Sequence, residues 1–293
     1  MSINQCKRYF LKECNSIDEF WKELCPEKPL GNKRGKFIYR GQRDETWPLV
    51  PSILRINKKT NVKTHIKCEE QVRNELLILN YFVDQCDLIG ISIINDSLEF
   101  RKKYLDFTVC DGEDKYFIDP SNWPSEELLE LMALAQHCGV PTSLLDWSKR
   151  SYVAAYFAAS SALKHYEKDS DDKLSVWALD IEKVKLYENV KLIKVPGSTS
   201  NNLAAQSGLF TFLKQPGKKG DIFSPRFLEN EFENTIDTPL WKITLPVKYS
   251  AEILKLCKLY GVSGATLFPN YNGVSRSVLD FINTILINNK IIN

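Results

Sequence analysis

The sequence predicts an α+β protein with a mixed or antiparallel β core and a helical segment inserted after the first strand of that core. Short runs rich in β-branched and aromatic residues, separated by turn residues, are typical of strands. Between residues 67 and 139, apolar residues instead recur at helical spacing. The composition, 43% hydrophobic and 26% charged, is that of a globular protein. We therefore expect one domain over 1–293, made of a helical lead-in (1–35), a β-rich core (36–66 and 140–293) and a helical insert (67–139).

The first core strand is predicted at 36–41, where aromatic and β-branched residues run up to Gly41. Pro48 and Pro51 mark a turn after it. Further strands are expected in four later apolar runs, at 174–179, 190–195, 208–212 and 240–245. Helices are expected between and after these strands, at 151–164, 251–260 and 278–287.

Capping residues support the helices expected before the core and in the insert. Ser16 precedes acidic and then apolar residues, which is typical of a helix start. In the insert, an apolar face that begins near Cys68 predicts a long helix, and 98–105 continues the helical region. The clearest helix is expected at 122–139, because acidic residues and an early proline open it and Gly139 ends it.

The charges and the cysteines exclude several classes of function. With 39 basic and 37 acidic residues, the net charge of +2 gives no overall attraction for nucleic acid, although a local basic patch is compatible with it. No two of the eight cysteines have the spacing of a zinc knuckle, and no carboxylate-rich metal cluster stands out. The N-terminus lacks the apolar stretch of a signal peptide, and no run is long enough for a membrane helix. We expect a cytoplasmic protein with reduced thiols, no metal and no membrane partner.

An arginine beside a glycine, at the end of the first core strand, is the first candidate for a binding site. Arg40 offers a bidentate donor to a phosphate or carboxylate, and Gly41 allows a ligand to approach the backbone. The alternative is a surface arginine paired with a nearby acid. Arg40 belongs to a basic neighbourhood made of Lys33, Arg34, Lys36, Arg40 and Arg43. These side chains either contact phosphates or form part of a solvated loop.

Residues 135–148, Ala-Gln-His-Cys-Gly-Val-Pro-Thr-Ser-Leu-Leu-Asp-Trp-Ser, crowd polar groups around an apolar pair. Buried polar groups need partners, so we expect a hydrogen-bonded network here. The alternatives are structural: His137 caps the helix that it ends, and Asp146 caps the helix that follows.

Gln206 is the third candidate, at the start of the strand expected at 208–212. Its amide could orient a ribose hydroxyl or a base, and the alternative is a surface or capping glutamine. Other catalytic patterns are missing from the sequence, which has three histidines, no Gly-x-Ser-x-Gly elbow and no glycine-rich phosphate loop.

These segments together resemble the FRG domain, a family named for a Phe-Arg-Gly motif. Residues 37–42, Phe-Ile-Tyr-Arg-Gly-Gln, match the first motif, with Tyr39 in place of the usual phenylalanine. Residues 135–148 match the second motif, and Ala-Ala-Tyr-Phe-Ala follows at 154–158. Ser143 departs from the family, which commonly has arginine there, and this removes one anion contact. The resemblance covers most of 36–270 and includes two later segments, at 206–210 and 267–270.

The order of these segments is also similar to the ADP-ribosyltransferase fold, which has a split β sheet. That resemblance implies that Arg40 grips the phosphate and ribose region of NAD, which is a substrate, and that the segment 142–146 supports the nicotinamide. A later side chain, Gln206 or Glu231, would orient the ribose or the acceptor. The implied catalytic residues are Arg40, Gln206 and Glu231. The implied NAD-binding residues are Tyr39, Arg40, Gly41, His137, Thr142, Ser143, Asp146 and Trp147, with Tyr39 or Trp147 stacking on nicotinamide.

Three hypotheses of function follow. The first is an ADP-ribosyltransferase-like enzyme that transfers ADP-ribose from NAD to a macromolecule, with DNA or RNA as a possible acceptor, in a toxin or phage-defence setting with an antitoxin or sensor protein as partner. The second is a non-catalytic module that binds a nucleotide or nucleic acid in the same cleft. The third is a partner-binding domain whose motifs lock the core. We favour the first, and a glutamine in the third position favours a nucleic-acid or non-standard acceptor, or no activity.

Overall fold

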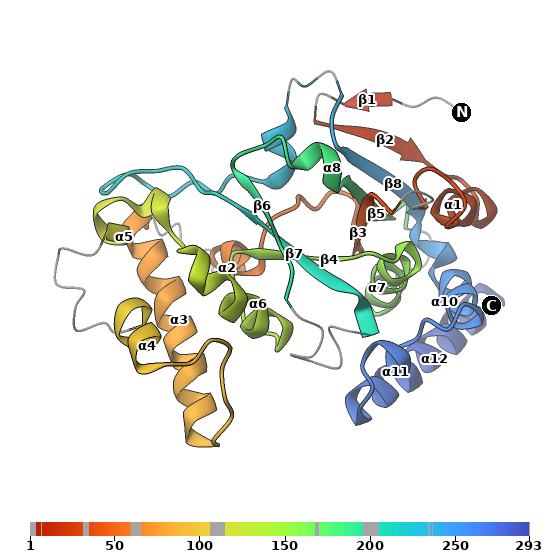
Figure 1. Ribbon diagram of the computed structural model, residues 1–293. Coiled ribbons are helices and arrows are strands. Elements are labelled where there is room, and N and C mark those ends of the chain that lie inside the picture. The colour runs from red at the N-terminus through yellow and green to blue at the C-terminus, as the bar shows by residue number, and fades with distance from the viewer. Residues whose placement is uncertain are drawn as a thin grey trace.

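The computed structural model describes residues 4–6, 8–31, 35–59, 66–105, 115–167, 170–195, 205–233, 235 and 237–292. The strands are β1 (Asn4–Cys6), β2 (Tyr9–Glu13), β3 (Phe37–Gln42), β4 (Leu144–Ser148), β5 (Lys173–Asp180), β6 (Val190–Ile193), β7 (Gly208–Leu213) and β8 (Leu240–Pro246). They form one eight-stranded sheet in the order β1-β2-β8-β5-β3-β4-β7-β6 (Figure 1). Among these strands only the pair β2–β8 is parallel. The predicted mixed, mainly antiparallel sheet is thereby confirmed.

Helices cover this sheet in two groups that lie at opposite ends of Figure 1. Near the N- and C-termini are α1 (Ile17–Leu24), α7 (Ser151–Leu163), α10 (Ser250–Leu259), α11 (Gly264–Leu267) and α12 (Tyr271–Ile292). The insert and its surroundings contain α2 (Ser52–Lys59), α3 (Cys68–Leu88), α4 (Leu98–Tyr104), α5 (Lys115–Ile118) and α6 (Leu129–His137), and α8 (Ile181–Val184) follows β5. The helical insert expected after the first core strand is therefore present.

The core is divided by the sheet, because successive side chains of a strand point to opposite faces. On β3, Phe37 and Tyr39 join the apolar cluster under α7 and α10, whereas Ile38 joins a cluster on the other face with Trp177. A third cluster joins α3 and α6 to β4 and β7, through residues such as Phe210. Arg40, the next residue on the face of Ile38, lies at the edge of these clusters and is only partly buried.

The predicted strands and helices of the core agree with β3, β5, β6, β7, β8, α7 and α10, and Ser16 caps α1 as expected. The lead-in 1–35 also contributes β1 and β2, which the sequence did not indicate. Their short sequences carry little alternation, and β2 is held by its pairing with β8, where the Phe10 and Trp241 rings lie 4.5 Å apart.

Three further elements differ from expectation. Residues 144–148, which were not among the predicted strands, form β4. The helix expected at 122–139 begins only at Leu129, after two 3-10 turns, and the last helix begins earlier than expected, at Tyr271.

The sheet opens between β3 and β4. These neighbours pair at one position, Tyr39 with Ser148, whereas β3 pairs with β5 over its whole length. A Cβ atom at Gly41 would lie 1.9 Å from the carbonyl oxygen of Ala154, so the glycine is required for α7 to pack against β3. This requirement differs from the expected role of Gly41 in ligand approach.

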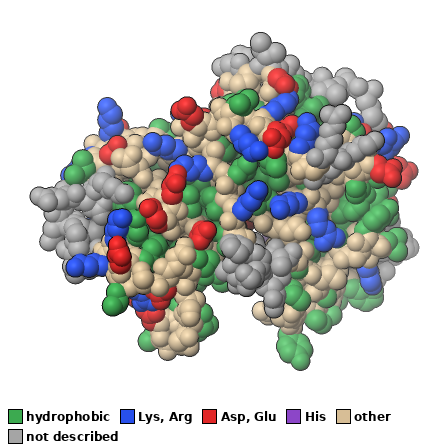
Figure 2. All heavy atoms as spheres, in the orientation of Figure 1, with side chains coloured by type: hydrophobic (Ala, Val, Ile, Leu, Met, Phe, Trp, Pro, Cys, Tyr) green, Lys and Arg blue, Asp and Glu red, His purple; other side chains and the backbone are tan. Residues whose placement is uncertain are grey.

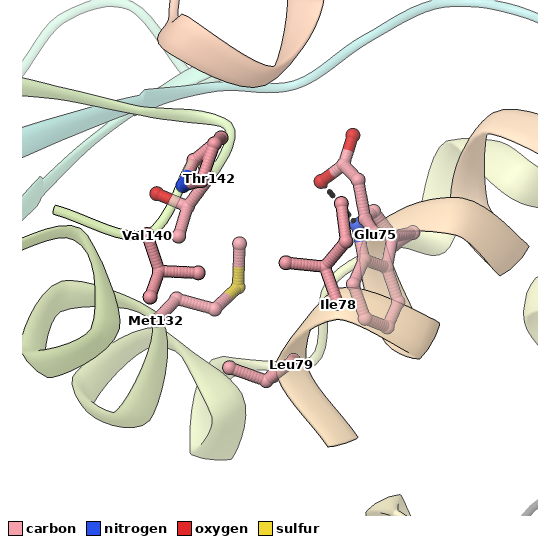
Figure 3. Close-up of a pocket in the computed structure, with 8 residues that line it drawn as sticks. Glu75, Ile78, Leu79, Met132, Val140 and Thr142 are labelled. Carbon is pink, nitrogen blue, oxygen red and sulfur yellow. Dashed lines mark hydrogen bonds between the residues drawn. The ribbon is translucent and has the colours of Figure 1, made fainter. Parts of the chain in front are cut away.

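The insert buries one carboxylate. Glu75 on α3 accepts hydrogen bonds from Gln71 Nε2 at 2.9 Å and from Trp123 Nε1 at 3.0 Å, one on each carboxylate oxygen. Figure 3 shows this carboxylate across a cavity of about 10 Å³ from Thr142. Burial raises the pKa of Glu75, against the effect of its hydrogen bonds.

None of the described helices is long and apolar enough to cross a membrane. Within the described ranges, no group of three or more His, Cys, Asp or Glu side chains could hold a metal ion. Free thiols are found at Cys14, Cys25, Cys68, Cys86, Cys138 and Cys257.

Candidate functional site

A cavity of about 400 Å³ lies where β3 and β4 diverge. Its walls come from β3 and the turn after it, α2, the end of α6, β4, α7, the residues before β7, and the segment from Phe268 to α12. Seven of the ten residues expected at a site line it: Tyr39, Arg40, Gly41, His137, Asp146, Trp147 and Gln206. The fold thus gathers the FRG-like motifs, which are far apart in sequence, around one space.

Arg40, on β3, lines the cavity where β3 and β4 diverge. Its Nη1 donates to the main-chain oxygen of Asp146 at 2.8 Å and lies 3.5 Å from the carboxylate Oδ2 of the same residue. The side chain is 14% exposed, so Arg40 does not lie on the open surface, but it is paired with a nearby acid, Asp146, as the alternative expected. Its Nε is buried and has no hydrogen-bond acceptor among the described residues. Arg40 is therefore held through Nη1, while its Nε stays without a partner among the described residues.

Arg55, on α2, is a second cation beside it, and no sequence pattern marked it as a site residue. Burial lowers the pKa of Arg55, and the positive charge of Arg40 lowers it further, so the two guanidinium groups are close enough to repel. Arg55 Nε is also buried without an acceptor in the described part of the chain. Two adjacent cations with unpaired donors are a site for an anion.

Aromatic rings line the cavity next to two more arginines. The Arg43 guanidinium lies 4.7 Å from the ring centroid of Trp47, and that of Arg276 lies 4.2 Å from the ring centroid of Phe268. Phe157, on α7, meets the Phe268 ring edge to face at 6.1 Å. Flat rings beside cations suit a ligand that has both aromatic and anionic parts.

Asp146 is the single carboxylate among the described residues that line the cavity. Its Oδ2 accepts from Gln136 Nε2 at 2.9 Å, and its side chain is 51% exposed. Gln136 Oε1 in turn accepts from the backbone N–H and the hydroxyl of Thr142 at 3.2 and 2.9 Å. The expected hydrogen-bonded network is present, and because α7 is capped by Arg150, Asp146 does not cap that helix.

His137 ends α6, as the structural alternative expected, and it also lines the cavity. Burial lowers its pKa, while the Asp146 charge acts in the opposite direction. Its Nε2 is buried and has no partner among the described residues. A neutral imidazole with a free ring nitrogen can accept a proton.

Gln206 lies just before β7 and lines the cavity. Its Nε2 donates to the main-chain oxygen of Leu267 at 3.2 Å, and its own main-chain oxygen accepts from Ser148 Oγ at 2.8 Å. Glu231 lies elsewhere, in a 3-10 turn, where it accepts from Arg226 and Asn189. Of the two candidates for the third position, only Gln206 lines the cavity.

Four other candidates have mainly interior surroundings. Thr142 and Ser143 are buried and line two small cavities on the side of the insert rather than this one. Tyr39 and Trp147 border the cavity, but their side chains bond to the Leu30 oxygen and to Thr211, and the residues are 1% and 3% exposed. Stacking area in the cavity comes instead from the less buried rings of Trp47, Phe157 and Phe268.

Sequence reasoning missed Arg55, Gln136 and Arg276 as members of the site. Arg55 and Arg276 belong to no motif, and only the packing of α2 and α12 brings them to the cavity. Gln136 lies inside the second motif, next to His137, so its position and its hydrogen-bonding amide could have identified it as a site residue. Lys36 of the expected basic neighbourhood pairs with Asp180 at 2.9 Å, and Lys33 and Arg34 lie outside the described residues.

Comparison with known proteins gives one match. The family model described as the FRG domain matches residues 35–167, which include Arg40, Arg55, Gln136, His137 and Asp146. Gln206 and Arg276 lie beyond it. No curated protein and no solved structure matches the chain.

Proposed function

The chain is an FRG-domain protein, and from that premise we propose that its cavity binds NAD and transfers ADP-ribose to a macromolecule. The observation that carries the proposal is the pair of arginines Arg40 and Arg55, each with an Nε that has no acceptor among the described residues, in a cavity of about 400 Å³ that aromatic rings also line. NAD joins two flat rings by a diphosphate, so its parts correspond to the groups that this cavity offers. Pockets of a few hundred Å³ are the usual size for such ligands.

In the proposed reaction the bond between C1′ of the nicotinamide ribose and the nicotinamide nitrogen breaks. Nicotinamide leaves with the bonding electron pair, and an acceptor hydroxyl or amine forms a new bond to C1′ and loses its proton. Arg40 holds the diphosphate, and the Asp146 carboxylate stabilises the positive ribose of the transition state. Neutral His137 can take the acceptor proton. Gln206 orients the ribose or the acceptor by its amide.

DNA or RNA is the acceptor that the lining supports best. Four arginines face a single carboxylate, which favours a second anionic molecule in or beside the cavity. Lys and Arg side chains also gather over the middle of the face drawn in Figure 2. The same observations support the second candidate, a module that binds a nucleotide or nucleic acid without chemistry. A toxin or phage-defence setting, with an antitoxin or sensor partner, stays a prediction from the resemblance.

The test is mass spectrometry of the purified protein incubated with NAD and with DNA, RNA or protein acceptors. We expect released nicotinamide and an acceptor heavier by one ADP-ribose, and both should be lost in Arg40→Gln. Arg8→Gln is the matched control, because Arg8 is an exposed arginine paired with Glu233 that does not line the cavity. If no nicotinamide is released but a nucleic acid binds with an affinity that falls steeply with salt, the binding module replaces the enzyme.

A further inference from the structure

Arg55 is a half-buried cation that lines the cavity together with Arg40. Its Nε is buried without an acceptor among the described residues, and the like charge of Arg40 acts on it more strongly than the opposite charge of Asp146. An arginine stays protonated in proteins, so this arrangement stores unfavourable electrostatic energy in the free protein. Such a cation is stabilised when an anion binds between it and Arg40.

The protein holds Arg55 in place for such a contact. Ile53 and Leu54, its neighbours on α2, are buried in a small apolar cluster with Val50. The Ile53 N–H donates to the Thr142 oxygen at 3.4 Å, and Ser52 Oγ donates to Gln136 Oε1 at 3.3 Å. The start of α2 is thus tied to the same residues that position Asp146. A ligand therefore meets a guanidinium whose backbone is already fixed, which lowers the entropy cost of binding.

The protein offers little negative charge to neutralise the pair. Asp146 is the single carboxylate among the described lining residues, and its Oδ2 already accepts from Gln136. Arg43 and Arg276 add positive charge at the aromatic side of the cavity. One monoanion leaves part of this positive charge unbalanced. A diphosphate has two adjacent phosphoryl groups, so each of the two guanidinium groups can bind one of them.

We propose that Arg40 and Arg55 together form a diphosphate-binding pair, with Arg40 on β3 and Arg55 on α2 each contacting one phosphoryl group. The inference deepens the proposed function, because it makes Arg55 a specificity-determining residue for the diphosphate of the substrate. It does not depend on turnover, since a diphosphate binds whether or not a bond is later broken.

The test is isothermal titration of the whole chain with inorganic pyrophosphate and, separately, inorganic phosphate, at one fixed ionic strength. We expect pyrophosphate to bind at least about tenfold more tightly than phosphate, because the second charge-assisted contact is available only to the larger anion. Arg55→Gln should weaken pyrophosphate binding by about tenfold to a hundredfold and bring it close to that of phosphate.

Two further variants make the result specific. Arg55→Lys keeps the charge and removes the planar fork, so we expect an intermediate affinity. Arg8→Gln should bind as the unchanged protein does, and thermal unfolding of each variant checks that it is folded. Equal affinity for the two anions, no binding of either, or full affinity in folded Arg55→Gln would each overturn the pair. If pyrophosphate binds as expected but NAD is not consumed, the pair stands and the transferase fails.

Discussion

Glu75 in the helical insert and the two arginines of the cavity between β3 and β4 are polar side chains taken out of water, but their hydrogen bonding differs. In the insert, each carboxylate oxygen of Glu75 accepts a hydrogen bond, and the space beside it is only about 10 Å³. In the cavity, Arg40 and Arg55 keep buried Nε donors without acceptors among the described residues, beside a space of about 400 Å³.

This difference separates a group that holds the fold from a group that is kept for a ligand. A buried polar group that is fully paired contributes to stability, and removing its partner exposes the full cost of its desolvation. A buried group that stays unpaired lowers stability, so its presence indicates another role. Substitutions in the insert should therefore change unfolding most, and substitutions of the two arginines should change binding most.

The largest effect is expected for Trp123→Ala. Trp123 is buried, packs edge to face on Tyr116 and donates to Glu75, so the substitution removes both apolar contact and a donor. We expect the free energy of unfolding to fall by about 3–5 kcal/mol, measured by urea denaturation. Trp47→Ala, in the cavity wall, removes the same side chain from a half-buried position and should cost clearly less. Equal losses would break the distinction between the two regions.

Gln136→Leu should have the next largest effect, because Gln136 belongs to both regions. Its Oε1 accepts from buried Thr142, and its Nε2 donates to Asp146 in the cavity. The loss leaves the Thr142 N–H without its acceptor, so unfolding free energy should fall by about 1–3 kcal/mol in urea denaturation. Gln206→Leu is the control, since its amide makes a single hydrogen bond within the described part of the chain, and it should cost less. If Gln136→Leu lowers the free energy of unfolding as little as Gln206→Leu does, Gln136 does not stabilise the hydrogen-bonded network of Thr142 and Asp146.

The sequence predicted more of the frame than of the site. Strands such as β5 and β8 were found because their apolar and β-branched runs are local signals, and α1 was found from its Ser16 cap. β4 was harder, because residues 144–148 carry polar groups inside an apolar run and gain their strand conformation from pairing with β7. The two N-terminal strands, β1 and β2, were missed because their short sequences carry little alternation, and β2 is held by its pairing with β8.

In the site, motif residues were easier to select than residues supplied by packing. Arg40, His137, Asp146 and Gln206 were expected and do line one cavity. Arg55 lies on a short helix whose direction is set by tertiary contacts, so nothing local marks it. Glu231 was selected by residue type alone, and no local pattern could reveal that Arg226 and Asn189 occupy its carboxylate.

A pH titration of stability should separate the paired carboxylate from the rest. Burial raises the pKa of Glu75 above its ordinary value of 4.5, so the folded protein keeps a proton that the unfolded chain releases. The contribution of Glu75 to stability is then complete below that ordinary value and is lost as pH rises through the raised pKa. Relative to Glu75→Gln, the unchanged protein should lose free energy of unfolding as pH rises above 4.5, measured by urea denaturation. Buried Glu229, whose pKa is also raised, is present in both proteins and cancels. If the free energies of unfolding of the two proteins change with pH in parallel, Glu75 is ionised in the folded protein.

The smallest effect on stability is expected for Arg55→Gln, and its sign tests the comparison most sharply. The substitution removes a cation that is repelled by Arg40 and whose buried Nε makes no hydrogen bond within the described residues. The free energy of unfolding should therefore change by less than about 0.5 kcal/mol, in the stabilising direction. Arg40→Gln should instead cost about 0.5–1.5 kcal/mol, because Arg40 donates to the Asp146 main-chain oxygen. Urea denaturation at low and high salt distinguishes the effects of the two substitutions. Salt screens the charge repulsion that Arg55→Gln relieves, so the effect of Arg55→Gln should shrink at high salt, whereas the loss of a hydrogen bond in Arg40→Gln should not. A loss of more than about 1 kcal/mol in Arg55→Gln would mean that Arg55 holds the fold as Trp123 does, and the two regions would no longer differ in kind.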